Sequence, residues 1–149
     1  MRLSARVDYA LRATAELAAT GDTPVTAERI ARAQQIPPKF LESILVQLRR
    51  AGIVNAQRGP EGGYWLARPA DQITLADVIS VIDGPLVGAR GQRPEDLGYT
   101  GPARALQQVW VALRAGERAI LESVTVADVA TGDLPLTVRE LTDDPTAWV

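Results

Sequence analysis

The chain has 149 residues, of which 46% are apolar, and it carries a formal net charge of −2 with no cysteine and no histidine. This length fits one globular domain, or one domain with an extension. The composition excludes disulfides, the common zinc sites, cysteine-ligated iron–sulfur clusters and histidine-based catalytic triads. No run of about 18 apolar residues occurs, and the charged N-terminus lacks the apolar segment of a signal peptide, so we expect a cytoplasmic protein.

The net charge hides a difference between the two halves of the chain. Residues 1–70 contain ten Lys and Arg against six Asp and Glu, a net charge of +4. Residues 71–149 contain six against twelve, a net charge of −6. This asymmetry favours a basic working surface on an otherwise acidic protein, although chance clustering on a solvated surface gives the same numbers.

The first part of the chain predicts two helices. In residues 5–20 the apolar residues recur at helical spacing, Ser4 can supply the N-cap and Gly21 can end the helix. Thr26 is expected to cap a shorter helix over residues 27–34. No capping box accompanies Thr26, because an arginine stands where a glutamate would be needed.

A third helix is predicted over residues 38–52, PKFLESILVQLRRAG, with proline in its first turn and glycine at its end. One side of this helix is apolar and consists of Leu41, Ile44, Leu45 and Leu48. The opposite side carries Lys39, Glu42, Ser43, Val46 and Arg50, flanked by Gln47 and Arg49. Two short helices joined by the turn QIPP predict a helix-turn-helix over about residues 26–51.

A β-hairpin is predicted directly after this helix, over residues 53–67. The strand-like stretches IVNAQ and YWLA flank RGPEGG, in which Gly59-Pro60-Glu61-Gly62 has the residues of a β-turn. The sequence thus predicts a mainly α fold with a small β-hairpin wing. Arg58 at the hairpin could reach a phosphate or a minor groove, and the small residues beside it would let a duplex approach; the alternative is a merely solvated arginine. We expect Tyr64 and Trp65 to pack onto the domain.

The residues after about 72 form a different predicted unit, over 73–131. Thr74 opens a helix that ends at Gly84, and Thr125 opens a short one with the same cap pattern. Between them a loop at 88–103 precedes a long helix over 103–124, roughly 33 Å in length. Its apolar stripe, which a winged domain would cover only in part, predicts a homodimer through Leu106, Val109, Trp110, Leu113, Ile120, Leu121 and Val124. Residues 132–149 show little periodicity and predict a flexible tail.

Three stretches, MRLSARVDYALRA, IPPKFLESILVQLRRAGIV and RGPEGGYWLARP, resemble the Rrf superfamily of bacterial winged helix-turn-helix transcription regulators. This family includes the iron–sulfur cluster regulator, the nitric oxide sensor NsrR and the cysteine regulator CymR. The resemblance covers about residues 1–131. It implies an N-terminal DNA-binding domain, over residues 1–72, and a long helix that pairs with its twin, so that a dimer binds a palindromic operator in double-stranded DNA. We expect a repressor.

The resemblance also implies roles for individual residues. Base-edge contacts fall on Lys39, Glu42 and Ser43, and the minor-groove contact on Arg58 with Gly59. The residues expected to hold phosphates are Arg49, Arg50, Arg2, Ser4 and Thr26. No catalytic, cofactor-binding or metal-binding residue is expected.

The loop at 88–103 departs from the family pattern. Cluster-binding members supply three cysteines there, whereas this loop, GARGQRPEDLGYTGPA, has none, so we expect regulation that does not depend on an iron–sulfur cluster. Asp8 and Glu16 could ligate a metal in principle, but two such carboxylates are more often solvated. If an effector exists, we expect a small organic molecule near the first helix and the long helix.

Two other function classes remain as alternatives to a DNA-binding regulator. One is a winged helix used as a protein-interaction module without DNA binding, which typically lacks a coherent basic recognition face. The other is an enzyme, which the sequence disfavours because neither histidine nor cysteine is available to a nucleophile–base pair. RGPEGG also follows a strand without opening a helix, so it does not form a phosphate-binding loop.

Overall fold

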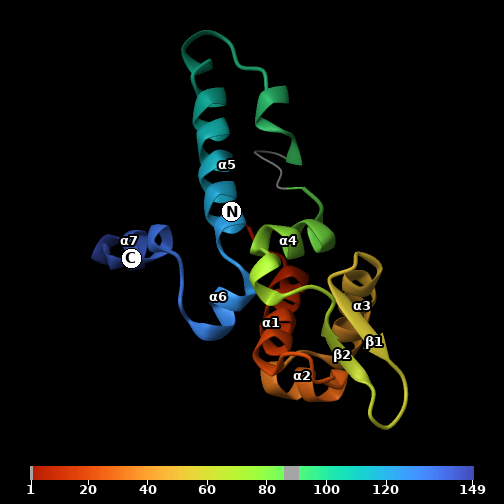
Figure 1. Cartoon of the computed structure of the whole chain (residues 1–149). Helices are drawn as coiled ribbons and strands as arrows, with labels where there is room; N and C mark the ends of the chain where they lie inside the picture. The colour runs from red at the N-terminus through yellow and green to blue at the C-terminus, as the bar shows by residue number, and fades with distance from the viewer. Residues whose placement is uncertain (1, 86–90) are drawn as a thin grey trace.

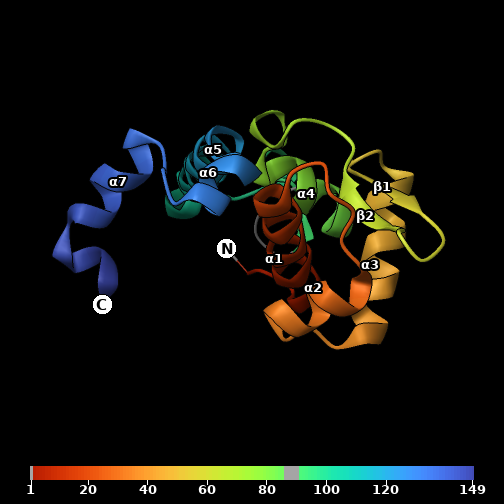
Figure 2. The same cartoon turned by 60° about the horizontal axis from the view of Figure 1, so that its bottom comes forward.

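The computed structural model describes residues 2–85 and 91–149; residues 88–90, at the start of the predicted loop, lie outside this part. The N-terminal part consists of α1 (Ala5–Thr20), α2 (Ala27–Gln34), α3 (Pro38–Arg50) and an antiparallel hairpin of β1 (Val54–Gln57) and β2 (Gly63–Leu66). Figure 2 shows α1 between two groups of elements: α2, α3 and the hairpin on one side, and α5 and α6 on the other. The mainly α fold with a small hairpin is confirmed.

The helix ends in this part follow from the predicted caps. The Ser4 hydroxyl oxygen accepts a hydrogen bond from the Val7 N–H at 3.1 Å, and the Thr26 hydroxyl oxygen accepts one from the Arg29 N–H at 3.2 Å. Gln35 takes a left-handed conformation, with φ of 53°, and its N–H donates to the carbonyl of Ala31 at the end of α2. The chain therefore turns sharply between α2 and α3, and the predicted helix-turn-helix is confirmed.

The second part contains α4 (Leu75–Asp83), α5 (Leu106–Ser123) and α6 (Val126–Thr131). Both predicted threonine caps form complete capping boxes, Thr74 with Asp77 and Thr125 with Asp128. Each box satisfies backbone donors at a helix start. The long helix is shorter than predicted, because residues 101–103 form a separate 3₁₀ turn before it.

A short antiparallel bridge fastens the end of α5 to the start of α4. The Leu75 N–H donates to the Val124 carbonyl at 2.9 Å, and the Val126 N–H donates to the Ile73 carbonyl at 2.8 Å. Figure 1 shows the result: the C-terminal end of α5 reaches the body beside α6, while its N-terminal end lies far from it. Along one side, most of α5 is not covered by any other element of the described residues.

The described part of the loop before α5 packs along that helix. The Trp110 indole N–H donates to the Tyr99 hydroxyl at 2.9 Å, and Arg114 forms an ion pair with Glu95 at 2.8 Å. The pKa of the Glu95 carboxyl lies below its ordinary value, because its own backbone N–H donates to it and because Arg114 and Arg93 lie close.

The C-terminal residues contain regular structure. A helix, α7 (Leu136–Asp143), and a 3₁₀ turn, Pro145–Trp148, follow α6 in the segment for which we predicted a flexible tail. The hydroxyl of Thr142 donates to backbone carbonyls of α7, and the Trp148 indole N–H donates to the Thr142 carbonyl at 2.7 Å, so local contacts hold these turns together. Figure 1 shows α7 apart from the rest of the chain, and its flexibility stays a prediction. Among the described residues, no helix is both long and apolar enough to cross a lipid bilayer.

Candidate nucleic-acid interface

The two sides of α3 are divided as the sequence predicts. Its four apolar positions, Leu41, Ile44, Leu45 and Leu48, are fully buried in the core. The opposite side is exposed and carries Lys39, Glu42, Ser43, Val46, Arg49 and Arg50. Phe40 is exposed as well, and its ring lies against that of Tyr9 with the centroids 6.1 Å apart. α3 thus presents a polar, mainly basic surface on a firmly packed base.

Arg6 of α1 forms hydrogen bonds with two residues in the middle of this surface. The sequence did not predict these contacts. One guanidinium nitrogen donates to the Ser43 hydroxyl oxygen at 2.8 Å, and the other donates to the side-chain oxygen of Gln47. The Ser43 hydroxyl itself donates to the Phe40 carbonyl at 3.1 Å. Ser43 therefore already uses its donor and one acceptor within the chain. These contacts join residues 37 and 41 positions apart, so no local pattern could have revealed them.

The hairpin forms the predicted turn, because the Gly62 N–H donates to the Gly59 carbonyl at 3.0 Å. Arg58 is exposed beside this turn. Tyr64 packs against the core as expected. Trp65 is half-buried, and it pairs across the hairpin with Asn55, on the face opposite to Tyr64.

Two of the three hairpin glycines are required by the protein's own backbone. The Tyr64 N–H donates to the Val25 carbonyl at 2.7 Å, and the Val25 N–H donates to the Tyr64 carbonyl at 2.9 Å. A Cβ at Gly63, where φ is +149°, would lie 2.7 Å from the Val25 carbonyl carbon. A Cβ at Gly62 would lie 2.2 Å from the Gln57 oxygen. Space for an approaching duplex therefore explains at most Gly59, which has φ of +105° and no atom within 4 Å of its Cβ position.

The expected phosphate-binding residues lie at two helix starts and on α3. Arg2 is exposed and Ser4 is half-buried in its cap at the start of α1. Thr26 is exposed at the start of α2, where it lines a surface hollow of about 370 Å³ together with Arg29 and Arg32. These two arginines were missed. The signal was available, since they follow Thr26 at intervals of three residues and lie outside the apolar side that contains buried Ile30.

The apolar stripe on α5 is partly accessible. Val109 and Leu113 are 53% and 55% exposed, and Leu106 is also exposed. Trp110 and Ile120 are half-buried. Leu121 and Val124 are only 6% and 3% exposed, and Leu121 packs with Val7 and Ile79 of its own chain. The bridge to α4 draws this end of α5 into the body, so these two residues do not belong to a surface that a second copy could contact.

The helix-turn-helix, its polar second helix and the adjoining hairpin with Arg58 define a winged helix protein of the DNA-binding type. Residues 3–132 match the model of the Rrf2 family, described as an iron-dependent transcriptional regulator, and the chain belongs to this family. A Mycobacterium tuberculosis protein provisionally named an HTH-type transcriptional regulator is 51% identical over 97% of this chain and 90% of its own length.

Solved structures support the same assignment. CymR, the global cysteine regulator of Bacillus subtilis, matches with a TM-score of 0.77 and 30% identity, over 88% of this chain and 97% of that one. The T. potens IscR structure matches with a TM-score of 0.71 and 29% identity, over 89% of this chain and 88% of that one. The chain is therefore a DNA-binding transcription regulator by family, and the family and these relatives carry names of regulators rather than of enzymes.

The iron in the family description has no matching ligand set in this chain. The chain has no cysteine, and the carboxylates of Glu95 and Asp8 are held in ion pairs with Arg114 and Arg12, each at 2.8 Å. Residues 2–85 and 91–149 contain no group of three His, Cys, Asp or Glu side chains that could hold a metal ion. The residues therefore do not fit an iron–sulfur cluster or a comparable iron site.

Proposed function

We propose that this chain acts as a homodimer that binds a palindromic DNA operator and represses transcription without an iron–sulfur cluster. The exposed face of α3 carries this proposal, because it presents a carboxylate and several cations on a helix of the kind that enters a major groove. Repression is the expected result where an occupied operator overlaps a promoter. The alternative, a protein-interaction module, is weaker because both helices of the helix-turn-helix expose cations, among them Arg29 and Arg32 of α2.

The proposal assigns different roles to the residues of this surface. Lys39 and Glu42 face base edges, and Ser43, whose second acceptor lone pair is unused, does so as an acceptor while Arg6 holds it. Arg58 and Gly59 occupy the minor groove. The phosphate contacts fall on Arg49, Arg50, Arg2, Ser4 and Thr26, with Arg29 and Arg32 added from the structure.

Selection of genomic fragments with the purified protein, followed by gel-shift titration at several salt concentrations, tests DNA binding directly. A sequence-specific regulator should enrich a palindrome and lose affinity steeply with salt, because phosphate neutralisation releases counterions. A protein-interaction module should enrich no sequence. Failure to enrich any fragment would contradict the proposed function.

Three substitutions on the DNA surface should have different effects. Arg50→Ala should weaken binding to all sequences and lower the salt slope by about one unit. Arg58→Ala should weaken binding most at sites with a narrow, A·T-rich minor groove under the hairpin. Glu42→Ala should hold or raise non-specific affinity, because it removes a negative charge, while losing about 1–3 kcal/mol of discrimination at one base pair. Equal losses for Glu42→Ala and Arg50→Ala on the operator and a scrambled duplex would show that α3 does not read bases.

Arg6 should act by positioning α3. Arg6→Lys keeps the charge but cannot hold Ser43 and Gln47 together, so discrimination between operator and scrambled DNA should fall roughly five- to tenfold, the value of about one hydrogen bond. Non-specific affinity and the salt slope should stay the same. Arg139→Lys, a like change on an exposed arginine of α7 outside the DNA surface, is the control and should alter neither quantity. Unchanged discrimination in Arg6→Lys would contradict a positioning role.

A further inference from the structure

A half-open cavity of about 330 Å³ lies where α1, the end of α2, the start of α4 and α6 meet. Its apolar wall consists of Leu11, Ala15, Leu75, Val126 and Val129. Val126 is buried, whereas Val129 is 42% exposed, so a molecule can enter from the side of α6. Cavities of a few hundred Å³ with apolar walls are typical of small-molecule sites, and an apolar cavity of about 150 Å³ holds benzene. The volume of this cavity is about twice that of the benzene-binding one.

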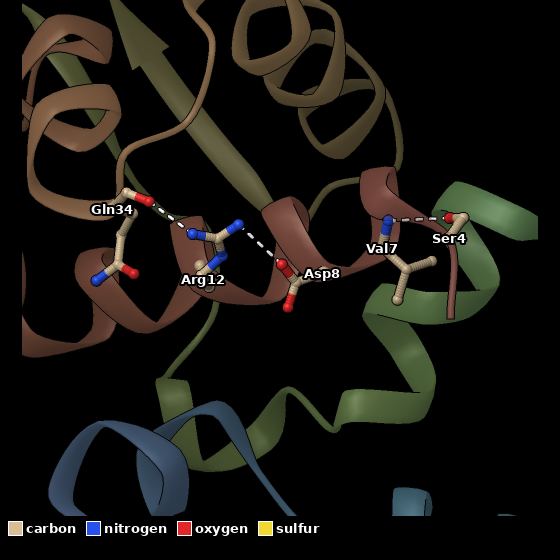
Figure 3. A network of polar contacts seen from close by, with 5 residues as sticks. All are labelled: Ser4, Val7, Asp8, Arg12 and Gln34. Carbon is tan, nitrogen blue, oxygen red and sulfur yellow. Dashed lines mark hydrogen bonds and ion pairs between the residues drawn. The ribbon is translucent and has the colours of Figure 1, made fainter. Parts of the chain in front are cut away.

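The polar part of the cavity comes from Arg12 and Gln34 (Figure 3). The Arg12 guanidinium donates to the Gln34 carbonyl at 2.6 Å, pairs with Asp8 at 2.8 Å and lies over the Tyr9 ring at 4.9 Å. Its remaining nitrogen, Nε, is buried and has no hydrogen-bond partner. Among the described residues, no other buried side-chain nitrogen or oxygen lacks a partner. A buried N–H without an acceptor is unfavourable, so a ligand oxygen would satisfy it after a small shift of the Arg12 side chain, which covers the atom in this structure.

The charges near Arg12 decide which kind of molecule fits. Asp8 already neutralises the guanidinium, and the carboxylate of Glu16 lies close enough to accept a hydrogen bond from the Gln34 amide. A carboxylate ligand would meet these two negative groups, whereas a neutral carbonyl or ether oxygen would not. The walls therefore favour a compact, mostly apolar, neutral molecule that carries one hydrogen-bond acceptor.

We propose that this cavity binds a small neutral molecule with one oxygen acceptor, and that its occupation is linked to DNA binding through Arg12. The link rests on the proposed function. Arg12 holds the carbonyl of Gln34, the last residue of α2, and the chain turns into α3 at the next residue. A ligand bonded to the same guanidinium therefore acts on the turn that sets α2 against α3. The effector expected from the sequence lay beside α1 and α5, whereas this cavity has α1 but no residue of α5 in its wall.

Binding is tested on the full chain by NMR titration with acetophenone and with α-methylstyrene, which has the same shape but lacks the oxygen. Acetophenone should bind about five- to tenfold more tightly, and the Arg12 Nε–H proton signal should move downfield only with acetophenone. Val129→Phe, which fills the cavity from its exposed side, should abolish binding. Val111→Phe, a like change at an exposed valine of α5, should leave it intact.

The outcomes separate this proposal from the proposed function. Four outcomes would each overturn the site: no binding, equal affinity for the two probes, tighter binding of benzoate than of acetophenone, or unchanged binding in Val129→Phe. Saturating acetophenone should change operator affinity about fivefold or more in the wild type but not in Val129→Phe. Binding that leaves operator affinity unchanged overturns the link. A protein that binds acetophenone normally but no DNA refutes the proposed function and leaves the cavity assignment standing.

Discussion

Leu113→Lys should convert the proposed dimer into monomers and reduce operator affinity by about a hundredfold or more. Leu113 is 55% exposed on the α5 stripe with Val109, and a buried lysine in a twofold interface would place two like charges against apolar surface. In the proposed complex, losing the second half-site removes most of the binding free energy, because the two halves of a palindrome are bound together. Sedimentation measures the mass, and gel shifts measure the affinity.

Val111→Lys is the matched control for this substitution. Val111 is exposed on the same helix, but two residues away from Leu113 it lies on the other side of α5. The Val111→Lys variant should therefore form the proposed dimer and bind the operator like the wild type. A wild type that is monomeric at micromolar concentration, or equal effects of the two substitutions, would contradict an interface along the α5 stripe.

Gly63→Ala should destabilise the fold by more than about 1–3 kcal/mol, the usual cost of forcing a residue other than glycine into such a conformation. Here a second effect adds to the backbone strain, because the new Cβ would lie 2.7 Å from the Val25 backbone and would separate the two bonded segments. Urea unfolding measures the change in the free energy of unfolding.

Gly98→Ala provides the comparison for Gly63→Ala. Gly98 has no atom within 4 Å of its Cβ position and no positive φ. Its substitution should be neutral, or stabilise the fold slightly by restricting the unfolded chain. If the two variants unfold at the same urea concentration, the close approach of the hairpin to Val25 does not contribute to stability.

The sequence predicted the elements whose ends depend on neighbouring residues. The start of α2 follows from Thr26, and both capping boxes are visible as a threonine three residues before an aspartate. The apolar side of α3 follows from helical spacing alone. Each of these features is set within a few residues of chain, so a single sequence contains the whole signal.

The features that the sequence did not reveal depend on residues far apart in the chain. Arg6 contacts Ser43 only once α1 and α3 are packed. Position 63 must be glycine because a Cβ there would clash with the Val25 backbone. Leu121 belongs to the same periodic stripe as Leu113, yet the bridge beside Thr74 turns it inward. Spacing shows which side of a helix is apolar, but it does not show which part of that side its own chain will cover.

The paired backbone bonds between Val25 and Tyr64 have a consequence for how this protein would select its sites. Val25 immediately precedes the cap of α2, so the hairpin is fastened to the helix-turn-helix itself and cannot swing independently of α3. In the proposed complex, the distance within one half-site between the minor-groove contact of Arg58 and the base contacts of α3 is then constant. One base pair inserted between them shifts the second contact by about 3.4 Å along the duplex, and the protein has no joint there to follow it. In the proposed dimer the separation of the two half-sites depends instead on α5, so the two spacings in an operator are set by different parts of the chain and can change independently.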